Sequence, residues 1–282
     1  MRMFPGVSTT GLLGCLALAA FGATAGLAGQ EEGQADDEAG GNGGFYLGLA
    51  APLGYMGATM QKSVDNTAAN TRVPEPRRGQ VFEDEVSGDA LAYGIGFVAG
   101  YRLPFSGGAY FLDAAVDVEA GGGDVEAQFP GVGISPERKQ LGESWPDRWN
   151  LARGTSYGVT LRLGGSPGGL RSRGISLHLL AGVRLAGAQF TNHFDGCFTT
   201  EPCAPAEFRS GREDRDMDFT VWRSGIGLEK ALSERIALRV EASYSAYARE
   251  EWTTHFDDVI VTVRSSMKAS EAGLAAGLLL RP

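Results

Sequence analysis

The chain has 282 residues, and its 42 glycines are about twice the usual share. The net charge of -9 and the pI near 5.0 argue against nucleic acid as a partner, because phosphate binding needs a basic face. A mean hydropathy of -0.11 and a single long apolar stretch exclude a membrane protein built from several helices. The glycines follow no three-residue period, which excludes collagen.

The N-terminus has the pattern of a secretory signal. Arg2 precedes an apolar stretch over residues 11–21, and Ala23-Thr24-Ala25 fits a cleavage site. We predict a signal peptide over residues 1–25, with a retained anchor as the alternative. Residues 26–43 are acidic and rich in glycine, which predicts a flexible leader.

Two cysteines, Cys197 and Cys203, remain once the signal peptide is removed. Two cysteines in an exported chain are expected to form a disulfide. The sequence contains no Cys-x-x-Cys motif, so we predict a structural link across a short loop rather than a redox site.

From residue 44 onward the dominant hydrophobic period is two rather than 3.6, which predicts strands. Residues 91–103 are the clearest case: Leu91, Ile95 and Phe97 share one face, and the other face is mostly glycine. The same alternation predicts eight strands, at residues 44–54, 91–103, 110–120, 157–164, 175–188, 222–230, 236–248 and 271–280.

The connections between these segments alternate in length. Three are short, at residues 104–107, 166–169 and 232–234, and four are long, at residues 55–90, 121–153, 191–216 and 250–267. Short turns at one end and long loops at the other are typical of bacterial outer-membrane barrels. We predict an all-β fold over residues 44–282: an eight-stranded antiparallel up-and-down transmembrane β-barrel with four long outer loops and three short periplasmic turns. A soluble ligand-binding barrel is the alternative fold.

Residues 218–252 resemble the last hairpin of the OmpA-type family of eight-stranded, porin-like outer-membrane barrels. That hairpin has a Gly-x-Gly strand, a short turn and an Arg-x-Glu strand with tyrosines near its end. The matching residues are Gly225, Gly227, Arg239, Glu241, Tyr244 and Tyr247. The resemblance implies the outer membrane of a Gram-negative bacterium and an interior Arg–Glu network.

The chain departs from that family at its last residues. Family members usually end in an aromatic residue that belongs to the assembly signal, whereas this sequence ends in Leu279-Leu280-Arg281-Pro282. We also expect no C-terminal peptidoglycan-binding domain.

Charged residues recur on the face that the alternation turns inward. An eight-stranded barrel is just wide enough for side chains, and buried charges must pair. We therefore predict a charge network that plugs the lumen, with inward glycines making room for it. A small passive pore is the alternative function. The predicted network contains Asp113, Asp117, Arg162, Arg184, Arg223, Arg239, Glu241 and Glu271.

No catalytic constellation is recognisable, so we expect no enzymatic activity and no cofactor or metal. His178 falls on an inward face, and His193 and His255 fall in or near predicted loops. The neighbours Asp257 and Asp258 of His255 leave a lipid- or peptide-hydrolysing enzyme as a remote alternative.

The predicted loops carry the remaining candidates. Tryptophan and arginine are enriched at binding hot spots. Trp145, Arg148 and Trp149 are therefore the predicted contact surface for an unknown extracellular partner. We otherwise expect a monomer whose partner is outer-membrane lipid, with a structural or surface-interaction role.

Overall fold

A computed structural model of the chain describes residues 43–73, 75, 77–129, 147–197 and 208–281. These residues belong to the second of two compact units, Gly40–Pro282. The predicted signal peptide and nearly all of the predicted leader lie outside the described residues. So do Trp145 and Cys203, and with Cys203 the predicted disulfide.

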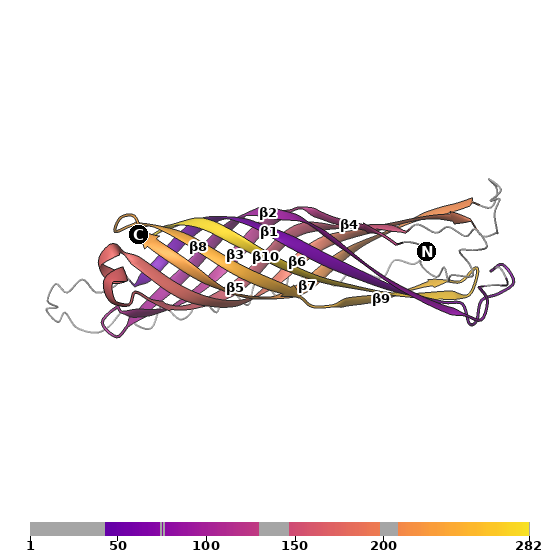
Figure 1. Ribbon diagram of the computed structural model, residues 1–282, viewed down its shortest axis with the longest axis horizontal. Helices are drawn as coiled ribbons and strands as arrows, with labels where there is room; N and C mark the ends of the chain where they lie inside the picture. Colours follow the sequence, from indigo (N-terminus) through magenta and orange to yellow (C-terminus); the bar gives the residue numbers. More distant parts are fainter. Residues whose placement is uncertain (1–42, 74, 76, 130–146, 198–207, 282) are drawn as a thin grey trace. The chain divides into compact units, whose positions relative to one another are not determined.

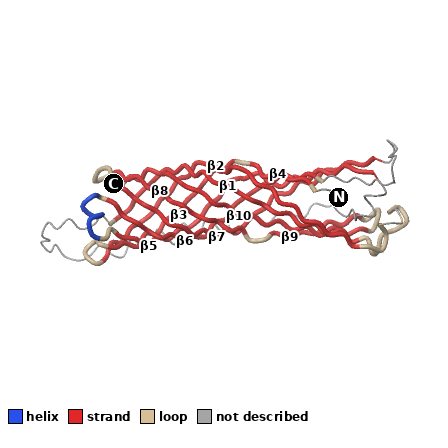
Figure 2. Tube along the Cα trace, viewed as in Figure 1, coloured by secondary structure: helices blue, strands red, loops and turns tan. Residues whose placement is uncertain are grey.

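The described chain is almost entirely strand. The strands are β1 (Gly44–Asp65), β2 (Val81–Phe105), β3 (Tyr110–Gly122), β4 (Asp124–Gln128), β5 (Arg148–Gly165), β6 (Ile175–Cys197), β7 (Phe208–Ala231), β8 (Ile236–Tyr247), β9 (Glu250–Phe256) and β10 (Val261–Leu280). One 3-10 helix, η1 (Gly168–Arg173), lies between β5 and β6 (Figure 2). Within the described ranges, no helix has the length and apolar character needed to cross a membrane.

The strands form one antiparallel, up-and-down sheet that closes on itself (Figure 1). Hydrogen bonds run in order through β1, β2, β3, β5, β6, β7, β8 and β10, and β10 pairs with β1 along nearly the whole of both strands. This ring of hydrogen bonds across about eight strands is like that of outer-membrane barrels. β4 follows β3 after a break at Gly123, and β9 follows β8 after a break at Ala248 and Arg249.

The predicted strand segments are too short at the ends far from the short turns. β1 continues to Asp65, and β2 begins at Val81, so only residues 66–80 connect them. β7 and β10 likewise begin at Phe208 and Val261, and β4 and β9 occupy other parts of the predicted loops. The prediction that residues 55–90, 121–153, 191–216 and 250–267 form long loops is therefore wrong over much of their length.

In the half of each strand next to the short turns, large apolar side chains point out of the ring. Exposed residues of this kind include Leu49, Leu53, Ile95, Leu161, Leu179, Ile226 and Leu274. Most exposed aromatic side chains in this half of the strands fall at two levels, and Phe97 of β2 lies between them. One level, near the turns, holds Phe45, Tyr101, Phe105 and Tyr110, and the other holds Tyr55, Tyr93, Tyr157, Trp222 and Tyr244. Phe45 and Tyr55 are about ten residues apart on β1, the length of about 9–11 residues that spans a bilayer core.

Beyond the second aromatic level, the polarity of the two faces reverses. On β1, even-numbered residues point inward throughout, but the inward residues change from Gly48 and Ala50 to Met56 and Met60. The outward residues change from Leu49 and Leu53 to polar side chains. Here the interior contains an apolar core that includes Met56, Met60, Val125, Trp149, Leu151, Phe190, Phe219, Trp252 and Met267. This reversal is why the pattern of large outward residues ends before the strands do.

The same region, which we call the extension, is no longer a closed ring. Pairing of β2 with β3 stops at Tyr93↔Gly122, and pairing of β7 with β8 stops at Val221↔Tyr247. Among the described residues, no strand pairing joins β2 to β4 or β7 to β9. The extension therefore consists of two sheets, β4-β5-β6-β7 and β2-β1-β10-β9, and both contribute side chains to the apolar core.

The two sheets of the extension approach each other differently at their two edges. A side chain at Gly88 of β2 would clash with the backbone of Glu126 on β4, so glycine permits this close approach. Between β7 and β9, side chains bridge the edge: Trp252 Nε1 donates to Glu213 Oε1 at 2.9 Å, and the Arg215 guanidinium lies 5.3 Å from the Trp252 ring centre.

Phe190→Ala tests whether the extension has a tightly packed core. Phe190 is 0% exposed and packs edge-on against Trp252, with ring centroids 5.2 Å apart. Removing the ring leaves a cavity, and we expect a loss of about 3–5 kcal/mol in the free energy of unfolding. Urea unfolding of the refolded protein in detergent measures it. The exposed Phe256→Ala is the control and is expected to change stability by about 0.5 kcal/mol or less. Equal effects of the two changes would contradict a packed core.

Candidate functional site

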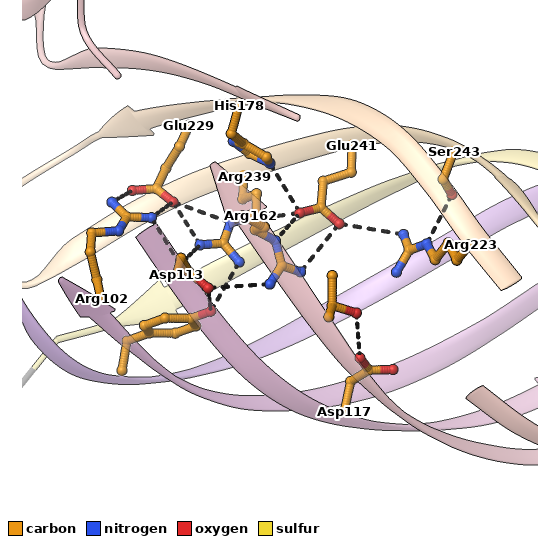
Figure 3. A network of polar contacts seen from close by, with 12 residues as sticks. Arg102, Asp113, Asp117, Arg162, His178, Arg223, Glu229, Arg239, Glu241 and Ser243 are labelled. Carbon is orange, nitrogen blue, oxygen red and sulfur yellow. Dashed lines mark hydrogen bonds and ion pairs between the residues drawn. The ribbon is translucent and has the colours of Figure 1, made fainter. Parts of the chain in front are cut away.

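The lumen next to the short turns contains a cluster of ion pairs centred on Asp113 of β3 (Figure 3). The Asp113 carboxylate is 0% exposed and lies within ion-pair distance of Arg102, Arg162 and Arg239. The Tyr46 hydroxyl donates a hydrogen bond to Asp113 Oδ1 at 2.7 Å. Three cations and a hydroxyl thus surround one carboxylate.

Two further carboxylates complete this cluster. Glu229 contacts Arg102 at 2.7 Å and Arg239 at 2.9 Å, and it also pairs with Arg281. Glu241 accepts a hydrogen bond from Arg162 Nε at 2.6 Å. Buried carboxylates are stable only when paired and hydrogen-bonded, and each of these has at least two cationic partners.

A second cluster lies farther along the strands, towards the extension. Arg184 Nη2 contacts Asp117 Oδ1 at 2.6 Å, and its Nη1 donates to Glu119 Oε2 at 2.7 Å. Arg153 Nη2 bridges Glu119 at 2.9 Å and Glu271 at 3.2 Å. Tyr247 also belongs to this cluster, because its hydroxyl donates a hydrogen bond to Glu271.

Inward glycines make space for the aromatic side chains that contact the carboxylates of the first cluster. A side chain at Gly100 would overlap the Tyr46 ring, and one at Gly227 would overlap the His178 imidazole. The His178 ring lies 3.1 Å from Glu241 Oε1, measured from Nε2. An inward glycine thus permits each of these side chains to reach its carboxylate.

Two small cavities adjoin the clusters, with volumes of about 60 and 30 Å³. Residues of both clusters line the larger cavity, and Arg153, Tyr247 and Glu271 of the second cluster line the smaller. Both are lined by Glu119, Arg184 and Arg223, and the larger also by Glu241. A water requires about 10–15 Å³ on this scale, so each cavity has room for at least one small polar guest.

All eight residues of the predicted network lie inside the ring, and each makes an ion pair. Arg162, Arg223 and Arg239 contact the first cluster, and Asp117, Arg184 and Glu271 belong to the second. Sequence reasoning missed Tyr46, Arg102, Glu119, Arg153, Glu229 and Arg281 as network members. Arg102, Glu119 and Glu229 lie on the inward alternation and could have been included. Arg153 fell within a predicted loop.

Two of the three residues of the predicted contact surface, Arg148 and Trp149, lie among the described residues. Arg148 is exposed, but Trp149 is 2% exposed, so its prediction as a surface contact is wrong. It lies on β5, not in a loop, and points into the apolar core of the extension.

The histidines form no reactive arrangement with one another. His178 lies in the lumen, whereas His193 and His255 are exposed. The His255 ring lies beside Thr262, with its Nδ1 3.1 Å from Thr262 Oγ1. In the part of the chain that the structure describes, no three His, Cys, Asp or Glu residues form a group able to hold a metal ion.

No protein-family model and no curated protein matches the chain. Solved structures give remote matches only. Ail of Yersinia pestis is 14% identical, covering 80% of this chain and 97% of Ail, with a TM-score of 0.24. Neisserial surface protein A is 14% identical, covering 84% and 97%, with a TM-score of 0.29. The translocator domain of NalP from Neisseria meningitidis is 12% identical, covering 81% and 88%, with a TM-score of 0.26. These scores are too low to support an inference about this chain.

Asp113→Ala tests the ion-pair cluster. Removing this carboxylate leaves three buried guanidinium groups short of a partner, and we expect a loss of about 3–5 kcal/mol in the free energy of unfolding. Urea titration of the refolded protein measures it.

Asp214→Ala is the matched control. Arg212 donates two hydrogen bonds to Asp214 and lowers the pKa of that carboxyl, but the pair is exposed on the extension. Exposed pairs contribute little, so no measurable change is expected. If Asp113→Ala also left the free energy of unfolding unchanged, the buried cluster would not stabilise the fold.

Proposed function

We propose that this chain is a β-barrel protein of the Gram-negative outer membrane, with a structural or surface-interaction role and a plugged lumen. One observation carries the proposal: the outward apolar band is bounded by two aromatic levels and ends where the strand faces reverse polarity. An apolar band flanked by aromatic girdles is the pattern of a barrel in lipid.

The chain contributes eight strands to the bilayer in this proposal. The three short connections, residues 106–109, 166–174 and 232–235, lie in the periplasm. The extension lies outside the cell, where water surrounds it. This orientation agrees with the short periplasmic turns and longer outer segments of outer-membrane barrels.

Two successive barriers support a lumen closed to passive diffusion. Within the apolar band, arginines and carboxylates fill the interior (Figure 3). Above them, the apolar core of the extension contains the fully buried Met60, Phe190 and Phe219. Hydrophobic constrictions exclude ions by dewetting. The apolar barrier therefore weighs against the small passive pore, even if the charged residues exchange partners.

The extension is the surface proposed for contact with other molecules. Its outward face carries polar and charged side chains such as Gln189, Asp216, Arg148 and Arg264, which water can solvate. The proposal includes no catalysis, no cofactor and no nucleic-acid partner, and it treats the protein as a monomer.

Leu161→Arg tests the membrane assignment. Leu161 is exposed near the middle of the apolar band on β5. In lipid, an arginine at that depth is expected to cost about 2–4 kcal/mol of folding free energy. Gln189→Arg is the control, because Gln189 is equally outward but lies on the extension. Urea-driven unfolding in lipid vesicles measures both.

For the unaltered chain expressed in a Gram-negative host, we expect recovery in the outer-membrane fraction and heat-modifiable migration in gels. Release of the protein by osmotic shock would favour the soluble barrel. So would equal effects of Leu161→Arg and Gln189→Arg on the free energy of unfolding.

Planar-bilayer recording tests the closed lumen. We expect no steady conductance steps from the protein. Glu241→Gln is expected to be equally silent, because the apolar core remains intact. Steady steps in the parent protein that disappear in Glu241→Ala would refute the plug and favour the pore.

A further inference from the structure

Of the arginines that line the two lumen cavities, Arg223 on β7 has the fewest carboxylate partners. Within the described ranges its one ion-pair partner is Glu241, at 3.3 Å, and its Nε donates to Ser243 Oγ at 3.1 Å. The other arginines that line these cavities each pair with at least two carboxylates: Arg153, Arg162, Arg184 and Arg239.

The single partner of Arg223 is itself shared. Glu241 binds Arg162 more closely, at 2.6 Å, and it also lies within 4.0 Å of Arg239 Nε. His178 takes a further position at its Oε1. Little of the negative charge of Glu241 is therefore left to neutralise Arg223.

Like charges add to this deficit. The guanidinium groups of Arg184 and Arg162 both repel that of Arg223, whereas the carboxylates of Glu241 and Asp117 attract it. Arg184 Nε is buried and has no hydrogen-bond partner. The wall of the larger cavity contains four arginines, Arg162, Arg184, Arg223 and Arg239, and three carboxylates, Asp117, Glu119 and Glu241. The wall therefore carries an excess of positive charge.

The space beside these arginines comes from small residues on the opposite wall. Ala50, Gly96, Ala275 and Gly277 line the larger cavity from β1, β2 and β10. A methyl group added at Gly96 would meet its nearest atom, Val118 O, at 3.4 Å, an ordinary contact. None of these four residues has a polar side chain that could balance Arg223.

We propose that the larger lumen cavity binds one small monovalent anion, such as chloride, against the Arg223 guanidinium with Arg184 beside it. A buried cation without full compensation is unfavourable, and an anion between two guanidinium groups removes both the deficit and their repulsion. The cavity of about 60 Å³ admits a halide with some water. This site would make the anion a structural part of the plug, which goes beyond the proposed function.

Bromide is the probe, because it replaces chloride and scatters anomalously. We expect crystals of the refolded protein grown in sodium bromide to show one anomalous peak beside Arg223. In solution, the unfolding temperature is expected to rise saturably when chloride or bromide replaces gluconate at constant ionic strength, since a ligand of the folded state stabilises it.

Arg223→Gln is expected to lose the peak and the whole anion-dependent shift. Arg212→Gln, on the same strand but exposed, is expected to keep both. If Arg223→Gln fails to fold, Gly96→Leu fills the cavity from the opposite wall and is expected to abolish the shift without removing an arginine.

A lumen holding only water, with no bromide peak, would overturn the proposal. So would an equal anion response in the parent protein and Arg223→Gln. These measurements use purified protein, so a failure of membrane localisation would be seen separately, in the fractionation.

Discussion

Closure of the sheet between β1 and β10 is the constraint on which the rest of the structure depends. In lipid, each backbone polar group must find its partner inside the protein, and a closed ring of strands supplies those partners. Closure of about eight strands leaves a narrow interior, which the inward residues must fill. Large apolar residues occupy the outward face, and charged residues with glycine occupy the lumen.

The ring opens where the chemistry of its outer surface changes. Pairing of β2 with β3 and of β7 with β8 stops close to Tyr93 and Trp222, which belong to the second aromatic level. In the proposed membrane orientation the extension lies in water, where unpaired strand edges can bond to solvent and closure is not required. The two sheets of the extension are then held together by burial of apolar side chains, as in a soluble sandwich. The same strands thus have an apolar exterior and a charged interior in one half, and a polar exterior and an apolar interior in the other.

The alternation of residues along the strands places some side chains correctly and others wrongly. The alternation identified Asp113 and Arg162 as inward neighbours, because the pleat assigns faces from local spacing alone. It placed Arg153 and Trp149 in a loop, because the pattern of large outward residues ends before the strands do. The short turns were located to within a few residues, and Gly and Pro mark two of the three directly.

Residue spacing along the chain is enough to show which residues share a face of each strand, where the short turns fall and that the inward face next to those turns is charged. The tertiary structure alone decided which charges meet and where the faces exchange polarity. Arg102 and Glu229 are 127 residues apart, and their contact depends on the register of every strand between them. Register is a property of the whole ring. It sets the two charged clusters, the cavities beside them and the incomplete pairing of Arg223.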